Sequence, residues 1–496
     1  MTVAVVIIAG AGSWVGWHRY QQAASPSRIM MAVLPFEDFT GDSQKEYFAD
    51  GLTEGMISQL GRLQPERLAV IARTSVAQYR HTKKSIKEIG RELGVQYVLE
   101  CSVQRVDNRM RVDAQLIHTS DQTQLWSESY EREIKDVLVL QSEVARAIAA
   151  QVRVKLSYEQ TAGLSRTRSL NPAAYDAYLR GGYFRAKMTE DGLRQAMTYF
   201  ELATKLDPTY AAAYAGLAGT TAAQPVLDVA SVRDSGPPAK AAALRALALD
   251  EGLAEGHAAL ALILLIYDWD WPGAERHYRR AIELDPNNAG IHGSYAIPYL
   301  ASLGRIAEEV AELERAVELN PLSLRDNLEL GQAYGVAGQY DRAIAQLRRA
   351  IELDPANSRA HGPLASVYED MGRYDEALVE LEKFEVTAAS DHPDVLARLA
   401  RCHARAGHQA EAQRIIERAE TLARTEDFDP FAFIAFYAAV GRRDDAFALL
   451  EKAYKERAVW LVSLRSNARF ASLRDDPRFA DLVRRIGIPE PSQEHR

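Results

Sequence analysis

The sequence predicts two folded parts, an α/β module followed by an all-α solenoid of paired helices, with a short membrane segment in front of them. Three observations lead to this prediction. Strand-like apolar runs alternate with amphipathic helical stretches over residues 28–156. From residue 172 onward, a pattern of Gly, Ala and Pro returns about every 34 residues. The stretch "VAVVIIAGAGSWVGW" at 3–17 contains no charged residue.

Composition limits the classes of function. Of 496 residues, 47% are hydrophobic and 26% are charged, as in an ordinary folded chain. The formal net charge is -9, and no basic stripe interrupts it, so we expect no nucleic-acid partner for this chain. The two cysteines, Cys101 and Cys402, are far apart and lack metal-ligand spacing. We therefore expect each to be a small buried apolar residue.

The first segment, residues 1–27, has two alternative interpretations. Gly10, Gly12 and Gly16 resemble the glycine turn of a dinucleotide-binding unit, but the Ser-Pro-Ser at 25–27 leaves no room for the crossover helix. We therefore predict a membrane anchor and linker. As a helix, fifteen residues cover about 22 Å, which is short of the roughly 30 Å hydrocarbon core. The spacing of Gly12 and Gly16 suits close packing of two such helices, so a homodimer is an open alternative.

Residues 28–156 predict the order strand, helix, strand, helix, three strands and a closing helix. The run "RIMMAVLPF" suits a strand buried on both faces, and "RLAVIAR" suits a second one. Capping boxes open the two helices between them, Ser43 with Glu46 and Ser85 with Glu88. Alternating apolar residues on both sides of an Asp-Asn turn at 107–108 predict a hairpin, which "QLWSESY" extends by a strand. An apolar stripe over 137–152 predicts the last helix.

Four stretches of this module carry a resemblance to a known family. They are "AVLPFEDFTGDSQKEYFADGLTEGMISQL", "VIARTSVAQYR", "IKEIGRELGVQYVLECSVQR" and "AQLIHTSDQTQLWSESYERE". Together they resemble the TolB amino-terminal-like domain of bacterial membrane-tethered regulators, over about residues 28–156. Cys101 departs from the pattern, because such sequences usually carry glycine there. The resemblance implies a binding or sensory module with no established catalytic residues.

A polar linker at 157–171 leads into the repeating part, residues 172–458. Tags of the form "IELDP" end in Pro208, Pro286, Pro321 and Pro355. The period of about 34 residues and the proline at the end of each tag resemble the tetratricopeptide repeat, with about eight units. Glycines end the first helix of each unit, and Ala343, Ala377 and Ala446 lie where the two helices cross closely. Two features are unusual for such repeats. A longer loop occupies 225–238, and Trp271 takes the place of a packing tyrosine. Residues 459–496 are expected to cap the last unit and end in a tail.

A search for chemistry finds no metalloprotease, zinc, phosphate-loop or serine-hydrolase motif in the sequence. Glu308 and Glu309 fit the solvated face of a helix. We therefore expect no catalytic residues, no cofactor and no metal.

The repeat resemblance implies a concave groove lined by the first helix of each unit, which takes a protein or peptide partner. The residues that fall at groove positions are Ile263, Ile266, Tyr267, Gln332, Val336, Ser366, Glu369, Asp370, Arg401 and Arg405. The apolar residues Ile263, Tyr267 and Val336 are expected to be exposed anchors, and the charged ones to set register. The Lys and Asn pattern that clamps a terminal carboxylate in such repeats is absent.

Two functions remain open. The first is a membrane-anchored, non-enzymatic interaction and sensory protein whose bulk, by family analogy, lies outside the cytoplasm. The weak charge signal of Arg19 and Arg28 favours the opposite topology. The alternative is the regulatory half of a signalling protein. Its output domain, a winged helix, Ser/Thr kinase or nucleotide cyclase, would lie on another chain or before Met1.

Overall fold

The computed structural model describes residues 28–38, 46–106, 108–152, 154, 170–227, 229–385, 393–425 and 430–490. The predicted membrane segment at 1–27 and most of the predicted linker at 157–171 lie outside the described residues. Within the described ranges, the structure contains no helix that is long and apolar enough to cross a bilayer.

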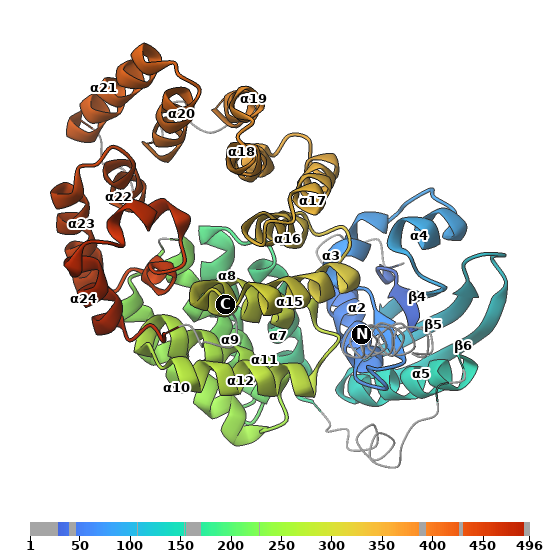
Figure 1. Cartoon of the computed structure of the whole chain (residues 1–496). Helices are drawn as coiled ribbons and strands as arrows, with labels where there is room; N and C mark the ends of the chain where they lie inside the picture. Colours follow the sequence, from blue (N-terminus) through green and yellow to red (C-terminus); the bar gives the residue numbers. More distant parts are fainter. Residues whose placement is uncertain are drawn as a thin grey trace, which may run out of the picture.

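The first part of the chain is an α/β module whose elements follow the predicted order (Figure 1). Its strands are β1 (Ile29–Val33), β2 (Glu37–Asp38), β3 (Leu68–Val70), β4 (Tyr97–Val106), β5 (Arg109–His118) and β6 (Gln124–Glu133). Its helices are α2 (Glu46–Gly61), α3 (Arg73–Val76), η2 (Ala77–Tyr79), α4 (Ile86–Leu93), η3 (Ile134–Asp136) and α5 (Val137–Gln151). The short strand β2 and the short helical elements α3, η2 and η3 are the elements that the sequence pattern did not indicate.

The sheet has the order β3-β1-β4-β5-β6, with β2 beside β4. Strand β1 runs parallel to both β3 and β4, whereas β4, β5 and β6 form an antiparallel meander. Met31, Ala32 and Val33 of β1 are fully buried, and Ile29 and Met30 are partly buried, which fits the continuous hydrophobic run. The capping box of Ser85 and Glu88 is present, and Gly94 ends α4 in the left-handed conformation. Cys101 and Cys402 are buried, as predicted.

The second part is an array of helices that pack as antiparallel pairs. The described residues form eight pairs: α7 (Pro172–Arg185) with α8 (Glu190–Leu206), α9 (Ala211–Ala223) with α10 (Val232–Leu249), α11 (Ala254–Ile263) with α12 (Trp271–Leu284), α13 (Ala289–Tyr295) with α15 (Ile306–Leu319), α16 (Leu324–Val336) with α17 (Tyr340–Leu353), α18 (His361–Asp370) with α19 (Tyr374–Glu385), α20 (Pro393–Arg405) with α21 (Gln409–Thr425), and α22 (Pro430–Ala439) with α23 (Arg443–Glu456). Short turns η4 (Gln224–Leu227) and η7 (Ser358–Ala360) lie between them.

Two first helices in the array carry a π-helical turn. Helix α11 continues into η5 (Leu264–Asp268), and α13 continues through η6 (Ala296–Leu300) into α14 (Ala301–Leu303). A π-helical turn adds a residue to the helix and shifts the side chains that follow it. The third and fourth pairs therefore present different faces from the regular pairs after them.

The regular pairs are built on glycine and alanine at fixed places. Gly338, Gly372 and Gly441 have positive φ angles and end their first helices, which a residue with a Cβ does less readily. Five residues after each, Ala343, Ala377 and Ala446 are 0% exposed, as predicted. A larger side chain at these crossings would push the two helices apart.

The last described segment closes the array on itself (Figure 1). It consists of η8 (Val459–Ser463), η9 (Ala468–Leu473) and α24 (Pro477–Ile486), which share one hydrophobic core with the third pair. Trp271 is 2% exposed, and its Nε1 donates to the Ile486 carbonyl at 3.5 Å. Arg457 donates to the Tyr267 carbonyl, and its guanidinium lies 4.3 Å from the centre of the Trp269 ring. The predicted packing role of Trp271 is confirmed.

The α/β module shares a hydrophobic core with α7 and is also bonded to the array by two asparagines, Asn287 directly after one repeat tag and Asn320 within the next. Asn287 Nδ2 donates to the carbonyls of Gly61 and Leu68 at 2.6 and 2.8 Å. Asn320 Oδ1 accepts from the hydroxyls of Thr74 and Ser75 at 2.8 and 2.7 Å. Both asparagines are buried. The ends of two second helices in the array therefore also help to hold the module in place.

Substituting Ala343→Leu or Ala377→Leu should each lower the free energy of unfolding by about 1 to 3 kcal/mol, because each overpacks a closed helix crossing. Ala345→Leu is the matched control, since Ala345 lies exposed on the same helix as Ala343. Denaturant melts followed by circular dichroism measure the effect. Equal stability of all three variants would contradict this account of the crossings.

Candidate functional site

The first helices of the fifth, sixth and seventh pairs carry a row of side chains at equivalent positions. Gln332, Ser366 and Arg401 occupy one position of the repeat, and Val336, Asp370 and Arg405 occupy another. Val336 is 69% exposed, and Asp370 and Arg405 are also exposed. We call these last three residues the exposed row. It offers solvent-facing groups on three successive helices, as expected for a binding face.

Hydrogen bonds and an ion pair connect helices α18 and α20 beside the exposed row. Glu369 is 4% exposed, and its Oε2 accepts from Arg401 Nε and Nη2 at 3.1 and 2.9 Å. Beside this pair, Arg398 Nη2 donates to Ser366 Oγ at 2.8 Å. The sequence analysis missed Arg398, although its spacing of three from Arg401 places both on one helix face. Glu369, Ser366 and Arg401 thus fix the seam between two helices rather than standing free.

The third pair does not present the predicted apolar anchors. Ile263 was expected to be an exposed anchor and is 1% exposed, so that expectation is wrong. The predicted groove residue Ile266 is also buried, at 4% exposed. Tyr267 is half-buried and packs so closely on Gly236 that a Cβ there would lie 2.0 Å from its ring. These residues lie against the second pair, next to Val232 and Ala239 of α10, and the π-helical turn η5 also contacts η8 of the C-terminal segment. The predicted groove residues therefore separate into an accessible group on α16, α18 and α20 and a buried group on α11 and η5.

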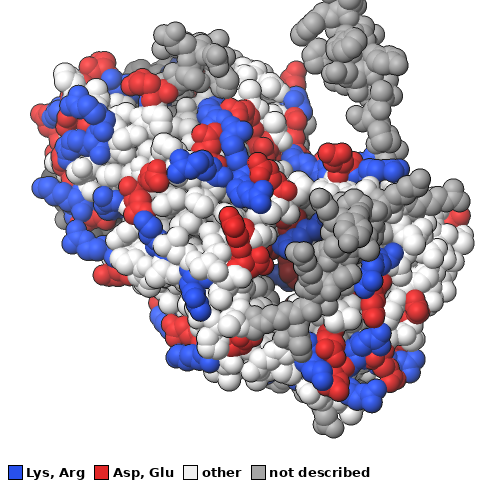
Figure 2. Space-filling view, turned by 90° about the horizontal axis from the view of Figure 1, so that it is seen from below, with Lys and Arg blue, Asp and Glu red and all other residues white. Residues whose placement is uncertain are grey.

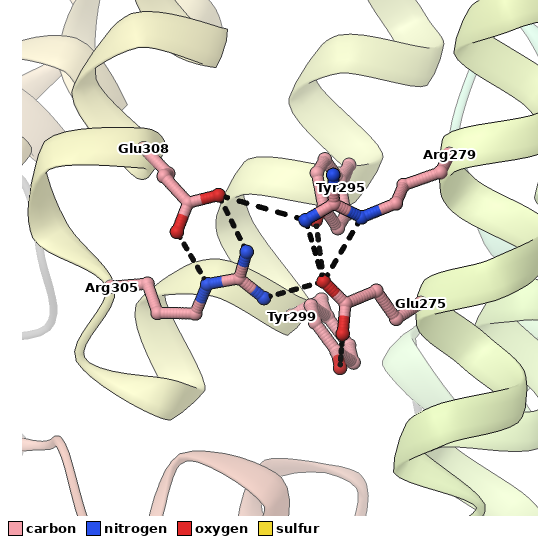
Figure 3. A network of polar contacts seen from close by, with 6 residues as sticks. All are labelled: Glu275, Arg279, Tyr295, Tyr299, Arg305 and Glu308. Atoms are coloured by element: carbon pink, nitrogen blue, oxygen red, sulfur yellow. Dashed lines mark hydrogen bonds and ion pairs between the residues drawn. The ribbon is translucent and has the colours of Figure 1, made fainter. Parts of the chain in front are cut away.

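A polar network joins the third pair to the fourth (Figure 3). Glu275 of α12 accepts from Arg305 at 2.7 Å and from Arg279 at 2.9 Å, and the hydroxyls of Tyr295 and Tyr299 donate to it at 3.3 and 3.2 Å. Burial works to raise the pKa of Glu275, but the hydrogen bonds from Arg305 and Arg279 hold it at about 2. Because Glu275 stays ionised and its partners lie within the fold, the network is a packing element.

The same arrangement recurs at the next seam, which supports its structural role. Tyr334 donates to Glu314 at 2.8 Å, and Arg342 donates to the same carboxylate at 2.6 Å. The Arg342 guanidinium also lies 4.0 Å from the centre of the Tyr334 ring. A tyrosine, an arginine and a glutamate thus tie one pair to the next in both places.

Glu308 and Glu309 were expected to share a solvated helix face, and for Glu309 this is wrong. Glu308 pairs with Arg305, with a closest contact of 2.5 Å. Glu309 is only 9% exposed, on a helix that packs against α16. Burial, and then the charge of Glu329, raise the pKa of Glu309 to about 8. The sequence did hold a signal, because Glu309 follows Gly304 by five residues, the place of the crossing alanine in other pairs.

The charged surface shows no sign of a nucleic-acid site on the face drawn in Figure 2. Acidic and basic side chains of the described residues are interleaved there, without a continuous basic stripe. Within the part of the chain that the structure describes, no group of three or more His, Cys, Asp or Glu is placed to hold a metal ion.

Comparisons with family models match two parts of the chain. Residues 27–147 match the second domain of HilA/YgeH-like transcriptional regulators, and residues 337–383 match a tetratricopeptide repeat. The array therefore contains tetratricopeptide repeats, as predicted. The α/β module matches a family other than the predicted one, and its resemblance to the TolB amino-terminal-like domain stays a prediction.

One curated relative is 37% identical to this chain over 192 residues, the protein named "Putative adenylate cyclase 3" of Rhizobium meliloti (strain 1021). The match covers 39% of this chain and 32% of the relative, so the chain matches about a third of that protein's length.

Solved structures with similar helical repeats have low sequence identity to this chain. PilF of Pseudomonas aeruginosa is 20% identical, with a TM-score of 0.36, over 44% of this chain and 94% of that one. Human IFIT1 is 16% identical, with a TM-score of 0.43, over 69% of this chain and 87% of that one.

Glu309 should make stability depend on pH. The ordinary pKa of this carboxyl is 4.5, and its pKa in the folded protein is about 8. Between pH 4.5 and pH 8 the unfolded chain therefore ionises this group while the folded protein keeps it protonated, and the free energy of unfolding falls as the pH rises. The native protein should therefore lose several degrees of melting temperature between pH 5 and pH 8 that the Glu309→Gln variant does not lose. Melts at both pH values measure this difference. The variant Glu308→Gln is the control, and a pH dependence lost there instead would contradict the assignment.

Proposed function

We propose that this chain is a non-enzymatic interaction and sensory protein whose repeats bind an extended segment of a partner protein. The observation that carries the proposal is the exposed row, Val336, Asp370 and Arg405, on three successive first helices. One helix pair offers too little area for stable binding, whereas a segment that crosses three pairs contacts all of them. The ion pair of Glu369 with Arg401 holds the two helices that carry Asp370 and Arg405 at a fixed spacing.

The order of side chains in the exposed row defines the chemistry of the partner. Val336 suits an apolar side chain, Asp370 a basic one and Arg405 an acidic one. A segment that carries these three kinds of residue in this order fits in one direction, because reversing it sets like charges against each other.

The test uses peptides selected from a random-sequence library on the native protein. Val336→Ser should weaken the selected peptides roughly fivefold to tenfold by removing about 1 to 1.4 kcal/mol of apolar contact. Val379→Ser is the matched control, because Val379 is 50% exposed but lies on the second helix α19. Reversing the charge with Asp370→Lys should select acidic residues in place of basic ones. Equal losses for Val336→Ser and Val379→Ser would contradict binding along the row.

A second function has its own support, that of the regulatory half of a signalling protein. The matched family is one of transcriptional regulators, and the curated relative is named as an adenylate cyclase. In this alternative, the α/β module and the repeats control an output domain, a winged helix, a kinase or a cyclase. The two proposals are compatible, since a partner segment on the repeats is also a means of regulation.

We further propose that residues 1–27 tether the protein to a membrane with its bulk outside the cytoplasm. Removing these residues should move the protein from the membrane fraction to the soluble fraction with unchanged helical content, because the described parts have their own cores. Protease protection of the full chain in intact cells tests the side, and cross-linking of full and shortened chains tests a homodimer held by Gly12 and Gly16. Membrane association of the shortened chain would contradict the tether.

A further inference from the structure

A cavity lies between the first two pairs of the array. Its volume is about 240 Å³, and its walls come from α8, α9, α10 and the connection between α9 and α10. An enclosed cavity of about 150 Å³ holds benzene, so this one has room for a ligand of roughly seven to nine non-hydrogen atoms. The predicted groove residues and the exposed row take no part in lining it.

The irregular connection of the second pair supplies one wall of this cavity. In the fifth and sixth pairs, three residues connect the two helices, whereas the longer segment 224–231 connects α9 to α10. The loop predicted at 225–238 is therefore shorter than expected, because residues 232–238 already belong to α10. Gln224 and Ala230 of the connection line the cavity. The extra length of this unit thus contributes to a hollow rather than to the packing of the pair.

Two buried hydroxyl groups in the cavity wall are available only as acceptors. Thr221 of α9 and Ser235 of α10 are each 3% exposed, and both line the cavity. Thr221 Oγ1 donates to the Leu217 carbonyl, and Ser235 Oγ donates to the Ser231 carbonyl, both at 2.8 Å. A hydroxyl group has one hydrogen and two lone pairs, so these bonds use the hydrogen and leave acceptor capacity on both oxygens.

Helices α10 and α8 add further acceptors to the same cavity. Asp234 and Pro238 both line it and lie about one turn apart on α10. Because Pro238 has no N–H, the Asp234 carbonyl lacks its usual helical donor. The Asp234 carboxylate accepts from Ser231 Oγ at 2.6 Å, and no described residue forms an ion pair with it. Glu201 of α8 supplies a second carboxylate that has no ion pair within the described residues.

The rest of the cavity wall is apolar, apart from one amide. Met197 of α8 and Leu217 of α9 line it together with Ala230 and Pro238. Among the described residues that line the cavity, only the Gln224 amide has hydrogens left to donate, and none is Lys, Arg or His. An anion would meet two carboxylates and no cation. An alkylammonium ion would find acceptors for its N–H groups and apolar surface for its carbon chain.

We propose that this cavity binds a small primary aliphatic amine in its protonated form. The ammonium group donates to oxygens of Thr221, Ser235 and Asp234, and the carbon chain lies against Met197 and Leu217. Such amines have a pKa close to that of lysine, about 10.4, so they are cations at neutral pH. The site goes beyond the proposed function, because the cavity belongs to the first two pairs and the exposed row to the fifth, sixth and seventh.

The probe for this site is n-hexylamine, and two molecules with the same chain are its controls. 1-Hexanol lacks the charge, and hexyltrimethylammonium keeps the charge but has no N–H group. Titration calorimetry with the full chain at pH 7 should show saturable binding of hexylamine, with each control weakened at least about tenfold. Equal binding of the three molecules would overturn the proposal. Tighter binding of Nα-acetyl-lysine methylamide than of hexylamine would also overturn it, in favour of a partner's lysine side chain.

Matched variants place the amine in the cavity. Thr221→Val keeps the shape of the side chain, removes an acceptor and should weaken hexylamine about fivefold. Thr220→Val is its control, because Thr220 is 0% exposed on the same helix, donates to the Gly216 carbonyl at 2.7 Å and does not line the cavity. Asp234→Asn should weaken hexylamine about tenfold, whereas Asp191→Asn in the first turn of α8 should leave it unchanged. Equal affinities of Thr221→Val and Thr220→Val, or an unchanged affinity of Asp234→Asn, would overturn the proposal.

Discussion

Beside a hydrophobic core shared with α7, the position of the α/β module on the array is fixed by two buried side-chain amides. Asn287 follows one repeat tag and Asn320 lies in the next. Asn287 donates to backbone carbonyls of the α/β module, and Asn320 accepts from its hydroxyls. A buried amide left without partners costs about 1 to 3 kcal/mol, so the module cannot shift along the array without losing several such bonds at once. Two anchor points in successive repeats also fix the module's rotation. Arg62 adds a third contact, at 3.1 Å from Glu255 and 3.5 Å from Asp285.

Docking of the module and closure of the array leave only some first helices available to a partner. The C-terminal segment packs on the third pair and on η6 of the fourth, where Trp271 and Tyr299 join its hydrophobic core. The fifth to seventh pairs keep an accessible row, held in place by the seam of Glu369 and Arg401. The accessible binding face is thus defined by what the protein covers with its own chain.

Local patterns predicted a large share of this structure. The order of the α/β elements, the capping box at Ser85 and the crossing alanines follow from rules that act over a few residues, and these were confirmed. The position of a residue within a repeat was predictable for the same reason. Its exposure was not, because burial of Ile263 and Ile266 depends on packing that includes a segment nearly two hundred residues later in the chain.

The polar contacts of the candidate site were the least predictable part. His292 lies 3.1 Å from the Pro286 carbonyl through Nε2, and in the next pair Asn327 takes the same place and donates to the Pro321 carbonyl at 3.2 Å. The residue type changes while the contact persists, so a sequence pattern does not mark it. For Glu309, the position within the repeat was predictable from the sequence, but the effect of Glu329 was not, because Glu329 belongs to another pair.

Closure of the array also restricts how this protein can change its length during evolution. In an open array each unit contacts only its neighbours, so duplication of one unit lengthens the protein at little cost. Here an extra unit of about 34 residues between the third and eighth pairs would move the C-terminal segment away from Trp271. The hydrophobic core that this segment shares with the third pair would then be exposed. The contacts of Asn287 and Asn320 impose a similar limit on the fourth and fifth pairs. The number of repeats is therefore set by geometry, and divergence in this chain is expected to proceed by substitution within units rather than by gain or loss of whole ones.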